Sequence, residues 1–194
     1  MNTDLTTAAP PSLPPHVQLI QMGIGGWVSA VVYHAARMKL ADHLAEGPKN
    51  AEQVAAATGT HAPTMHRFMR TLAGFGILTE GEGGRFALTP LGEALRSDAP
   101  GAAWPTLMAF CGPMFTRAWE EMPHSLATGL TAFEKMWGVP FFDYLGKHPE
   151  EASQFSQAMV GVHGTEPPAV AAAYDFSTAK TVTERYSKRS NHRP

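Results

Sequence analysis

Residues 50–90 read NAEQVAAATGTHAPTMHRFMRTLAGFGILTEGEGGRFALTP, and this stretch decides the fold. Asn50 precedes an apolar run and Gln53 stands three residues later, which is the spacing of a capping box. Gly59 then supplies the residue that commonly ends a helix. A further helix is expected behind it, because Pro63 suits a first turn. Its apolar side chains recur at helical spacing on one face: Met65, Phe68, Met69 and Leu72.

The second half of this stretch predicts a β-hairpin. Apolar and polar residues alternate on both sides of EGEGG, and these glycines suit a tight reversal of the chain. Thr89 can then cap a short helix whose first position is Pro90. Helices followed by a hairpin are the order of a winged helix. We therefore predict a mainly α-helical fold with a winged helix at about 50–98 and long flanking helices.

A long apolar stripe precedes this region. From Leu19 to Gly47-Pro48 the apolar positions fall three and four residues apart, which predicts one long first helix. The stripe comprises Ile20, Ile24, Trp27, Val28, Val31, Val32, Ala35 and Met38. The rest of the chain is too small to cover such a side, so we expect a homodimer in which the flanking helices swap or interlock.

The second half of the chain is also expected to be helical. Gly112-Pro113 and Pro123 should cut it into pieces, and residues 131–164 form a segment dense in aromatic and methionine side chains. A last long helix should begin near Pro149.

Composition places the chain among cytoplasmic proteins. The net charge of −2 and the pI near 6.5 give no overall attraction to nucleic acid or to an anionic membrane. The single cysteine, Cys111, excludes an intramolecular disulfide, and the nine histidines form no metal-binding pattern. Residues 1–16 read as a disordered leader and not as a signal peptide. The nearly apolar run 101–115 is too short and too broken by proline to span a bilayer.

Several separated motifs, in this order, give the sequence a specific resemblance: MKLADHLAEGP, the winged helix, TPLGEALRSD, TAFEKMWGVPFFDYLGKHPEEASQFSQAM and YDFS. Over roughly residues 17–182 the chain resembles the N-terminal part of bacterial small-molecule O-methyltransferases of the plant caffeate and acetylserotonin type. The resemblance implies a winged-helix dimerisation domain at 17–98 and a helical substrate-lid region at 99–177.

In that family a strand reading V-D-V-G-G-G-x-G follows YDFS, and its glycines meet S-adenosylmethionine. Here TV at 181–182 begins that strand and TERYSKRSNHRP follows it. We therefore expect residues 178–194 to be a polar tail in place of the catalytic domain. We expect no catalytic residue in this chain and no binding of S-adenosylmethionine by this chain alone.

The resemblance also implies site residues for the full-length enzyme. In the resembling enzymes the helix that corresponds to FSQAMVGVHG runs along the cavity for cofactor and substrate. Met159 and His163, which are one helical turn apart, would therefore touch the cofactor at its edge. The residues expected to surround a small phenolic substrate are Trp137, Phe141, Phe142, Tyr144, Phe155 and Met159. Each of these side chains could equally be part of the hydrophobic core.

Two other functions remain open from the sequence. A winged helix can bind DNA, with Arg67, Arg70 and Arg85 as the contacts. However, residues 50–98 carry four Arg or Lys against five Asp or Glu, and Glu80 and Glu82 stand in the wing itself. Alternatively, the chain could be an interaction module that holds a full-length methyltransferase in inactive mixed dimers.

Overall fold

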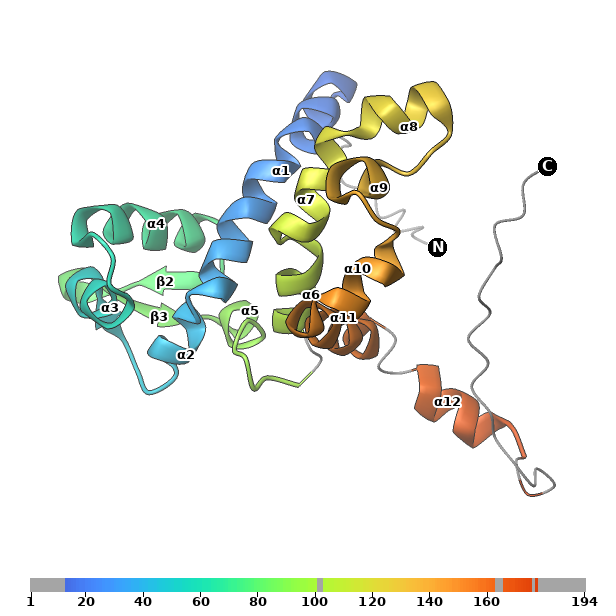
Figure 1. Ribbon diagram of the computed structural model, residues 1–194. Helices are drawn as coiled ribbons and strands as arrows, with labels where there is room; N and C mark the ends of the chain where they lie inside the picture. Colours follow the sequence, from blue (N-terminus) through green and yellow to red (C-terminus); the bar gives the residue numbers. More distant parts are fainter. Residues whose placement is uncertain (1–12, 101–102, 163–165, 176, 178–194) are drawn as a thin grey trace, which may run out of the picture. The chain divides into compact units, whose positions relative to one another are not determined.

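The computed structural model describes residues 13–100, 103–162, 166–175 and 177. The chain divides into two compact units, residues 1–162 and residues 163–194. The second unit contributes one described helix, α12 (Glu166–Ala173). The first unit holds the other described helices and a small antiparallel sheet, as Figure 1 shows. This arrangement confirms the expected mainly α-helical fold with a small hairpin.

The described elements of the first unit are, in chain order, α1 (Pro15–Arg37), α2 (Leu40–Leu44), β1 (Lys49–Asn50), α3 (Ala51–Thr58), α4 (Ala62–Gly74), β2 (Leu78–Glu80), the 3-10 turn η1 (Glu82–Gly84), β3 (Arg85–Leu88), α5 (Pro90–Glu93), α6 (Ala103–Phe110), α7 (Pro113–Glu120), α8 (Met122–Thr128), α9 (Ala132–Trp137), α10 (Phe141–Lys147) and α11 (Pro149–Val162). The helix α1 begins at Pro15, so the last two residues of the segment expected to be a disordered leader are helical.

The single long first helix expected up to Pro48 is wrong, because the chain forms two helices there. Lys39 adopts the left-handed conformation, with φ of 51°, between α1 and α2. This conformation costs an L-residue roughly 1–2 kcal/mol. Packing at the junction offsets that cost. The indole Nε1 of Trp104 donates to the carbonyl oxygen of Ala36 at 2.8 Å, and the Lys39 ammonium lies 5.7 Å from the Trp104 ring centroid.

The helices α3 and α4 follow the local signals in the sequence. The Asn50 side chain accepts from the Gln53 N–H at 2.9 Å, and the Gln53 side chain accepts from the Asn50 N–H at 3.0 Å, which completes the capping box. Gly59 ends α3 in the left-handed conformation, with φ of 65°. In α4 the buried face consists of Met65, Met69 and Leu72.

The sheet has the strand order β1-β3-β2, and both pairs are antiparallel. In the hairpin Leu78 pairs with Leu88 and Glu80 pairs with Phe86. The pairing of β1 with β3 places Lys49 opposite Phe86, and this third strand was not expected from the sequence. Phe86 thus occupies the central strand, where its side chain is fully buried.

Residues 40–95 form one region around this sheet, which we call the helix-hairpin region. The largest fully buried side chains of its core are Val54, Leu40, Met69, Leu72 and Phe86. The end of α1 and the start of α6 pack against the same core through Ala35, Ala36 and the half-buried Leu107. The helix-hairpin region and the later helices therefore share a continuous hydrophobic interior.

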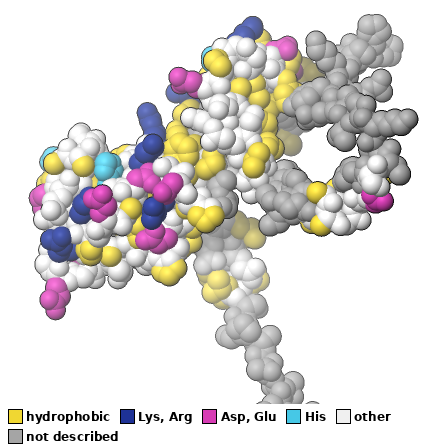
Figure 2. Space-filling model, turned by 90° about the horizontal axis from the view of Figure 1, so that it is seen from below, with side chains coloured by type: hydrophobic (Ala, Val, Ile, Leu, Met, Phe, Trp, Pro, Cys, Tyr) yellow, Lys and Arg dark blue, Asp and Glu magenta, His cyan; other side chains and the backbone are white. Residues whose placement is uncertain are grey.

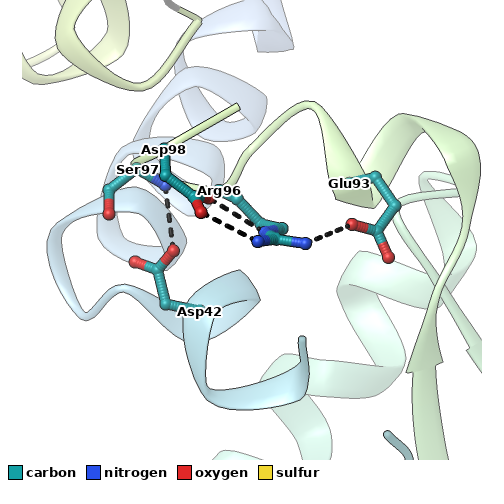
Figure 3. A network of polar contacts seen from close by, with 5 residues as sticks. All are labelled: Asp42, Glu93, Arg96, Ser97 and Asp98. Carbon is teal, nitrogen blue, oxygen red and sulfur yellow. Dashed lines mark hydrogen bonds and ion pairs between the residues drawn. The ribbon is translucent and has the colours of Figure 1, made fainter. Parts of the chain in front are cut away.

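A polar network connects α2 with residues 93–98 at the end of the helix-hairpin region (Figure 3). Asp42 on α2 accepts from the Ser97 N–H at 3.0 Å. The Arg96 guanidinium donates to the Asp98 carboxylate at 2.9 and 3.0 Å and to Glu93 at 3.2 Å. The hydrogen bonds from Arg96 hold the pKa of Asp98 below its usual range. The chain is thus held to α2 directly before it enters α6.

The second half of the first unit is built on α6 and α11. These helices pack along each other, and the contact buries small side chains, Ala109 on α6 and Ala158 on α11. Gly112-Pro113 separates α6 from α7, as the sequence predicted. The helices α7, α9 and α10 complete this half and carry most of its aromatic side chains.

Candidate functional site

Aromatic rings from five helices meet in one cluster in the second half of the first unit. We call it the aromatic cluster, and its members are Phe110, Phe115, Phe133, Trp137, Phe141, Tyr144 and Phe155. The rings of Phe141 and Phe155 lie edge to face with centroids 4.9 Å apart. Phe133 meets Phe141 at 5.1 Å and Tyr144 at 5.4 Å, again edge to face. These separations are those of favourable aromatic pairs.

Local caps position the rings on α9. The Thr131 hydroxyl accepts from the Glu134 N–H at 3.2 Å and begins the helix, and Gly138 ends it in the left-handed conformation, with φ of 75°. The indole of Trp137 donates to the carbonyl oxygen of Met114 at 3.0 Å. This bond connects α9 to α7, so the Trp137 ring has a fixed orientation beside Tyr144.

The structure brings together four of the side chains predicted to surround a substrate: Trp137, Phe141, Tyr144 and Phe155. Phe142 is 61% exposed, and its ring centroid lies 5.2 Å from that of Phe141. Met159 is half-buried on α11, one turn after Phe155. His163 lies outside the described residues.

Tyr144 has a distinct electrostatic environment. Its ring stacks on that of His148 with centroids 4.0 Å apart, and His148 Nδ1 lies 4.0 Å from Glu151 Oε1. Burial, and second the nearby charge of Glu151, raise the pKa of the Tyr144 hydroxyl. Tyr144 is therefore a neutral hydrogen-bonding group with a carboxylate close to it.

A cavity of about 320 Å³ lies beside the aromatic cluster, and we call it the Tyr144 cavity. It is lined by Tyr33, Arg37, Met108, Ala109, Pro113, Met114, Trp137, Tyr144, Glu150, Glu151 and Gln154. The sequence indicated Trp137 and Tyr144 as site residues, but it did not indicate the contribution of α1. Residues 33 and 37 are one helical turn apart, but nothing in the sequence shows that α1 faces α11.

The glycine-rich stretch MGIGGW, residues 22–27, contains the kind of glycines found in phosphate-binding loops. Gly23, Gly25 and Gly26 lie inside α1, so MGIGGW is helix and not a loop before a helix N-terminus. Within the ranges that the structure describes, no three His, Cys, Asp or Glu side chains gather as a metal site.

The first half of α1 exposes an unusually apolar surface. Ile20 is 59% exposed, Trp27 is 74% exposed, and Ile24 and Val28 lie on the same side of the helix. By length and composition α1 is also the one described helix that could cross a membrane. Core helices of soluble proteins can have the same length and composition, so these two features alone do not indicate insertion. A large exposed apolar area usually marks a contact surface.

The arginines considered for DNA binding have partners within the chain. Arg70 lies 3.6 Å from Glu80, Arg67 is within 3.5 Å of the Thr64 hydroxyl, and Arg85 donates to the carbonyl oxygen of Pro48. Figure 2 shows acidic and basic side chains interspersed over the helix-hairpin region, at the left of the view. This face carries no continuous basic stripe.

Fold and sequence together define the class of protein. Residues 21–98 match the family model of the O-methyltransferase dimerisation domain. Residues 21–98 therefore belong to this family of dimerisation domains, and the resemblance noted from the motifs is confirmed.

Particular relatives extend the match into the later helices. The phenazine O-methyltransferase PhzM of Lysobacter antibioticus is 43% identical over 166 residues, which are 86% of this chain and 48% of that enzyme. The crystal structure of LaPhzM is 42% identical with a TM-score of 0.78, over 84% of this chain and 49% of that one. This chain therefore spans about half the length of the relatives that it matches.

A third similar structure was solved with ligands. NcsB1, an O-methyltransferase from neocarzinostatin biosynthesis, is 30% identical with a TM-score of 0.67, over 77% of this chain and 46% of that one. It was crystallised in complex with S-adenosylmethionine and 2-hydroxy-5-methyl naphthoic acid.

Proposed function

We propose that this chain supplies the dimerisation and substrate-covering part of an S-adenosylmethionine-dependent O-methyltransferase. The acceptor would be a phenolic hydroxyl of a small aromatic secondary metabolite. The observation that carries the proposal is the match to the phenazine O-methyltransferase, because its 166 residues extend well beyond the dimerisation domain at 21–98 into the helices of the aromatic cluster.

The exposed half of α1 supports the dimer. Ile20 and Trp27 lie on one side of the helix, and the described chain leaves both largely uncovered. A second copy that packs its own α1 there would bury these side chains in a symmetric, self-complementary contact. Each fully buried side chain of this size contributes about 1.5–3 kcal/mol.

The aromatic cluster supports the substrate-covering role. Phe141 and Phe155 are half-buried, so each offers ring surface that its neighbours do not cover. A planar phenol can stack on such rings, while the flexible thioether of Met159 fills the irregular space beside them. The role of Met159 and His163 at the cofactor edge is part of this proposal.

In this proposal the chain positions the acceptor molecule and takes no part in making or breaking bonds. Methyl transfer requires the acceptor oxygen in line with the donor methyl group, together with a base for the hydroxyl proton. The aromatic cluster would hold the ring plane and exclude water. We assign no residue of this chain as the base, and we place the protein in the cytoplasm.

Size-exclusion chromatography with light scattering tests the dimer. The wild-type chain should elute at twice 20.9 kDa, and the double variant Ile20→Glu, Trp27→Glu should elute at 20.9 kDa. Leu126→Glu is the matched control, since Leu126 is 81% exposed on α8 and should leave the dimer intact. A monomeric wild-type chain at micromolar concentration would contradict the proposal.

A hybrid enzyme tests the substrate-covering role. Residues 13–177 of this chain would replace the matching half of the Lysobacter phenazine O-methyltransferase, and methyl transfer to a hydroxylated phenazine would be measured. We expect an active hybrid, and Phe141→Ala with Phe155→Ala should lower kcat/KM by tenfold or more, which is about 1.4 kcal/mol in the transition state. Leu126→Ala is the control. Unchanged activity in the phenylalanine variants would refute the role of the cluster.

A further inference from the structure

The Tyr144 cavity holds charged groups of both signs that do not neutralise each other. Arg37 comes from the last turn of α1, and Glu150 and Glu151 come from the first turn of α11. Among the described residues Arg37 and Glu150, which are both exposed, form no ion pair, and Glu151 Oε1 lies 4.0 Å from His148 Nδ1. The cation and the carboxylates thus line one cavity without meeting across it.

The cavity also holds hydroxyl groups without partners. Tyr33 is 8% exposed and Tyr144 is 7% exposed, and neither hydroxyl forms a hydrogen bond with another residue in the described part of the chain. Both hydroxyl oxygens remain accessible to solvent, whereas Asp42 Oδ2 is a buried atom without a hydrogen-bond partner. Both side chains line the cavity. An accessible tyrosine hydroxyl can donate a hydrogen bond to a ligand atom or accept one from it.

The shape and size of the Tyr144 cavity restrict the ligands that it can hold. Tyr33, Trp137 and Tyr144 contribute aromatic side chains to its wall. The volume of about 320 Å³ lies at the lower end of ligand pockets, which span roughly 300–1,000 Å³. An aromatic molecule of one or two rings fits this space, whereas a large polycyclic molecule does not.

The charged side chains that line the cavity restrict the choice of ligand further. A simple amine would meet the Glu150 and Glu151 carboxylates but would be repelled by Arg37, and a simple carboxylate would meet the opposite difficulty. We propose that the Tyr144 cavity is a binding site for a small aromatic zwitterion, a one- or two-ring molecule with an amine and a carboxylate. Its amine faces Glu150 and Glu151, its carboxylate faces Arg37, and its ring lies among the tyrosine and tryptophan rings.

This site shares Trp137 and Tyr144 with the aromatic cluster, but its test does not depend on methyl transfer. It needs neither a cofactor nor the uncovered surfaces of Phe141 and Phe155. An inactive hybrid enzyme would therefore leave this inference standing, and the loss of zwitterion binding would leave the proposed function standing.

Three related probes test the inference on the full 194-residue chain: L-tryptophan, tryptamine and indole-3-propionate. Titration calorimetry and ligand-observed NMR avoid the overlap of indole fluorescence with that of the protein. We expect saturable one-to-one binding of L-tryptophan, at least about tenfold tighter than either single-charge probe, since each charge-assisted contact adds to the affinity.

Charge-removing variants assign the two contacts. The double variant Glu150→Gln, Glu151→Gln should weaken L-tryptophan about tenfold and leave indole-3-propionate unchanged or tighter. Arg37→Met should also weaken L-tryptophan about tenfold but leave tryptamine unchanged or tighter. Glu82→Gln and Arg67→Met, which make the same types of substitution in the helix-hairpin region, should alter nothing. The inference is overturned if L-tryptophan shows no saturable binding at millimolar concentration, or if it binds these variants and the controls equally.

Discussion

The substitution Gly92→Ala should destabilise the chain strongly, because Gly92 lies where the backbone of α5 meets the hairpin. A Cβ atom added at Gly92 would lie 2.2 Å from the carbonyl oxygen of Ile77 and 3.1 Å from Leu88 Cδ2. Carbon and oxygen atoms that are not bonded do not approach so closely. The obstructing atom belongs to the backbone, so a change of side-chain rotamer cannot relieve the clash, and α5 must move away.

Moving α5 costs hydrogen bonds as well as packing. The Thr89 N–H donates to the Ile77 carbonyl at 3.2 Å, and the Thr89 hydroxyl donates to the Gly76 carbonyl at 2.6 Å. Two such bonds contribute about 2 kcal/mol together. The overpacking adds about 1–3 kcal/mol, and the better helix propensity of alanine returns about 1 kcal/mol. The net loss in the free energy of unfolding should be about 2–4 kcal/mol.

The matched control is Gly146→Ala, the same substitution inside α10, where an added Cβ would meet no atom within 4 Å. Here only the helix propensity changes, so the free energy of unfolding should rise by as much as about 1 kcal/mol. Urea and thermal unfolding followed by far-ultraviolet circular dichroism would measure both variants. The reasoning is refuted if Gly92→Ala is as stable as the wild type, or if both variants shift in the same direction.

Three further predictions follow from other parts of the chain. Thr89→Val removes the hydroxyl that caps α5 and accepts from the Gly92 N–H at 3.2 Å, and it should lower the free energy of unfolding by about 1–2 kcal/mol in urea denaturation. Burial and the charge of Glu151 raise the pKa of Tyr144 in the folded chain. The contribution of Tyr144 to folding stability is therefore complete below its pKa of about 10 in the unfolded chain, and it is lost as the pH rises through the folded pKa. Tyr144→Phe should therefore flatten the fall in stability at alkaline pH, and an unchanged slope would contradict this. Finally, residues 1–194 alone should show no saturable binding of S-adenosylmethionine in titration calorimetry, because the side chains at one edge of a cofactor cannot repay the roughly 4 kcal/mol or more that association costs.

The sequence predicted the helix-hairpin region well because its signals are local. The capping pair Asn50 and Gln53 needs only the three-residue spacing that the sequence displays, and Gly59 ends its helix through its own backbone freedom. The hairpin follows similarly from the alternating pattern and from the glycines between the strands.

The break between α1 and α2 could not be predicted in this way. Lys39 adopts a conformation that usually requires glycine or asparagine, and its stabilising partner Trp104 stands far along the chain. The strand β1 was missed for a related reason. Its pairing with β3 is non-local, so the two residues Lys49 and Asn50 show no strand pattern of their own.

The candidate site was predicted in part. Residues of one dense segment, such as Trp137, Phe141 and Phe155, can be selected from composition and from the family resemblance. The residues that α1 contributes, Tyr33 and Arg37, are more than a hundred positions away from α11 in the chain. Only the packing of α1 against α6, and of α6 against α11, brings them to the same cavity.

The same helix also shows why an apolar composition does not by itself identify a membrane segment. The second half of α1 is part of the hydrophobic interior, where Ala35 and Ala36 are buried and the Ala36 carbonyl accepts from Trp104. A bilayer position would require α1 to leave these contacts and would expose the core beneath them. The first half remains apolar and uncovered, and the dimerisation-domain match begins at residue 21, within that half. A second copy of α1 can cover this half without disturbing the buried half, and we therefore infer a subunit interface there.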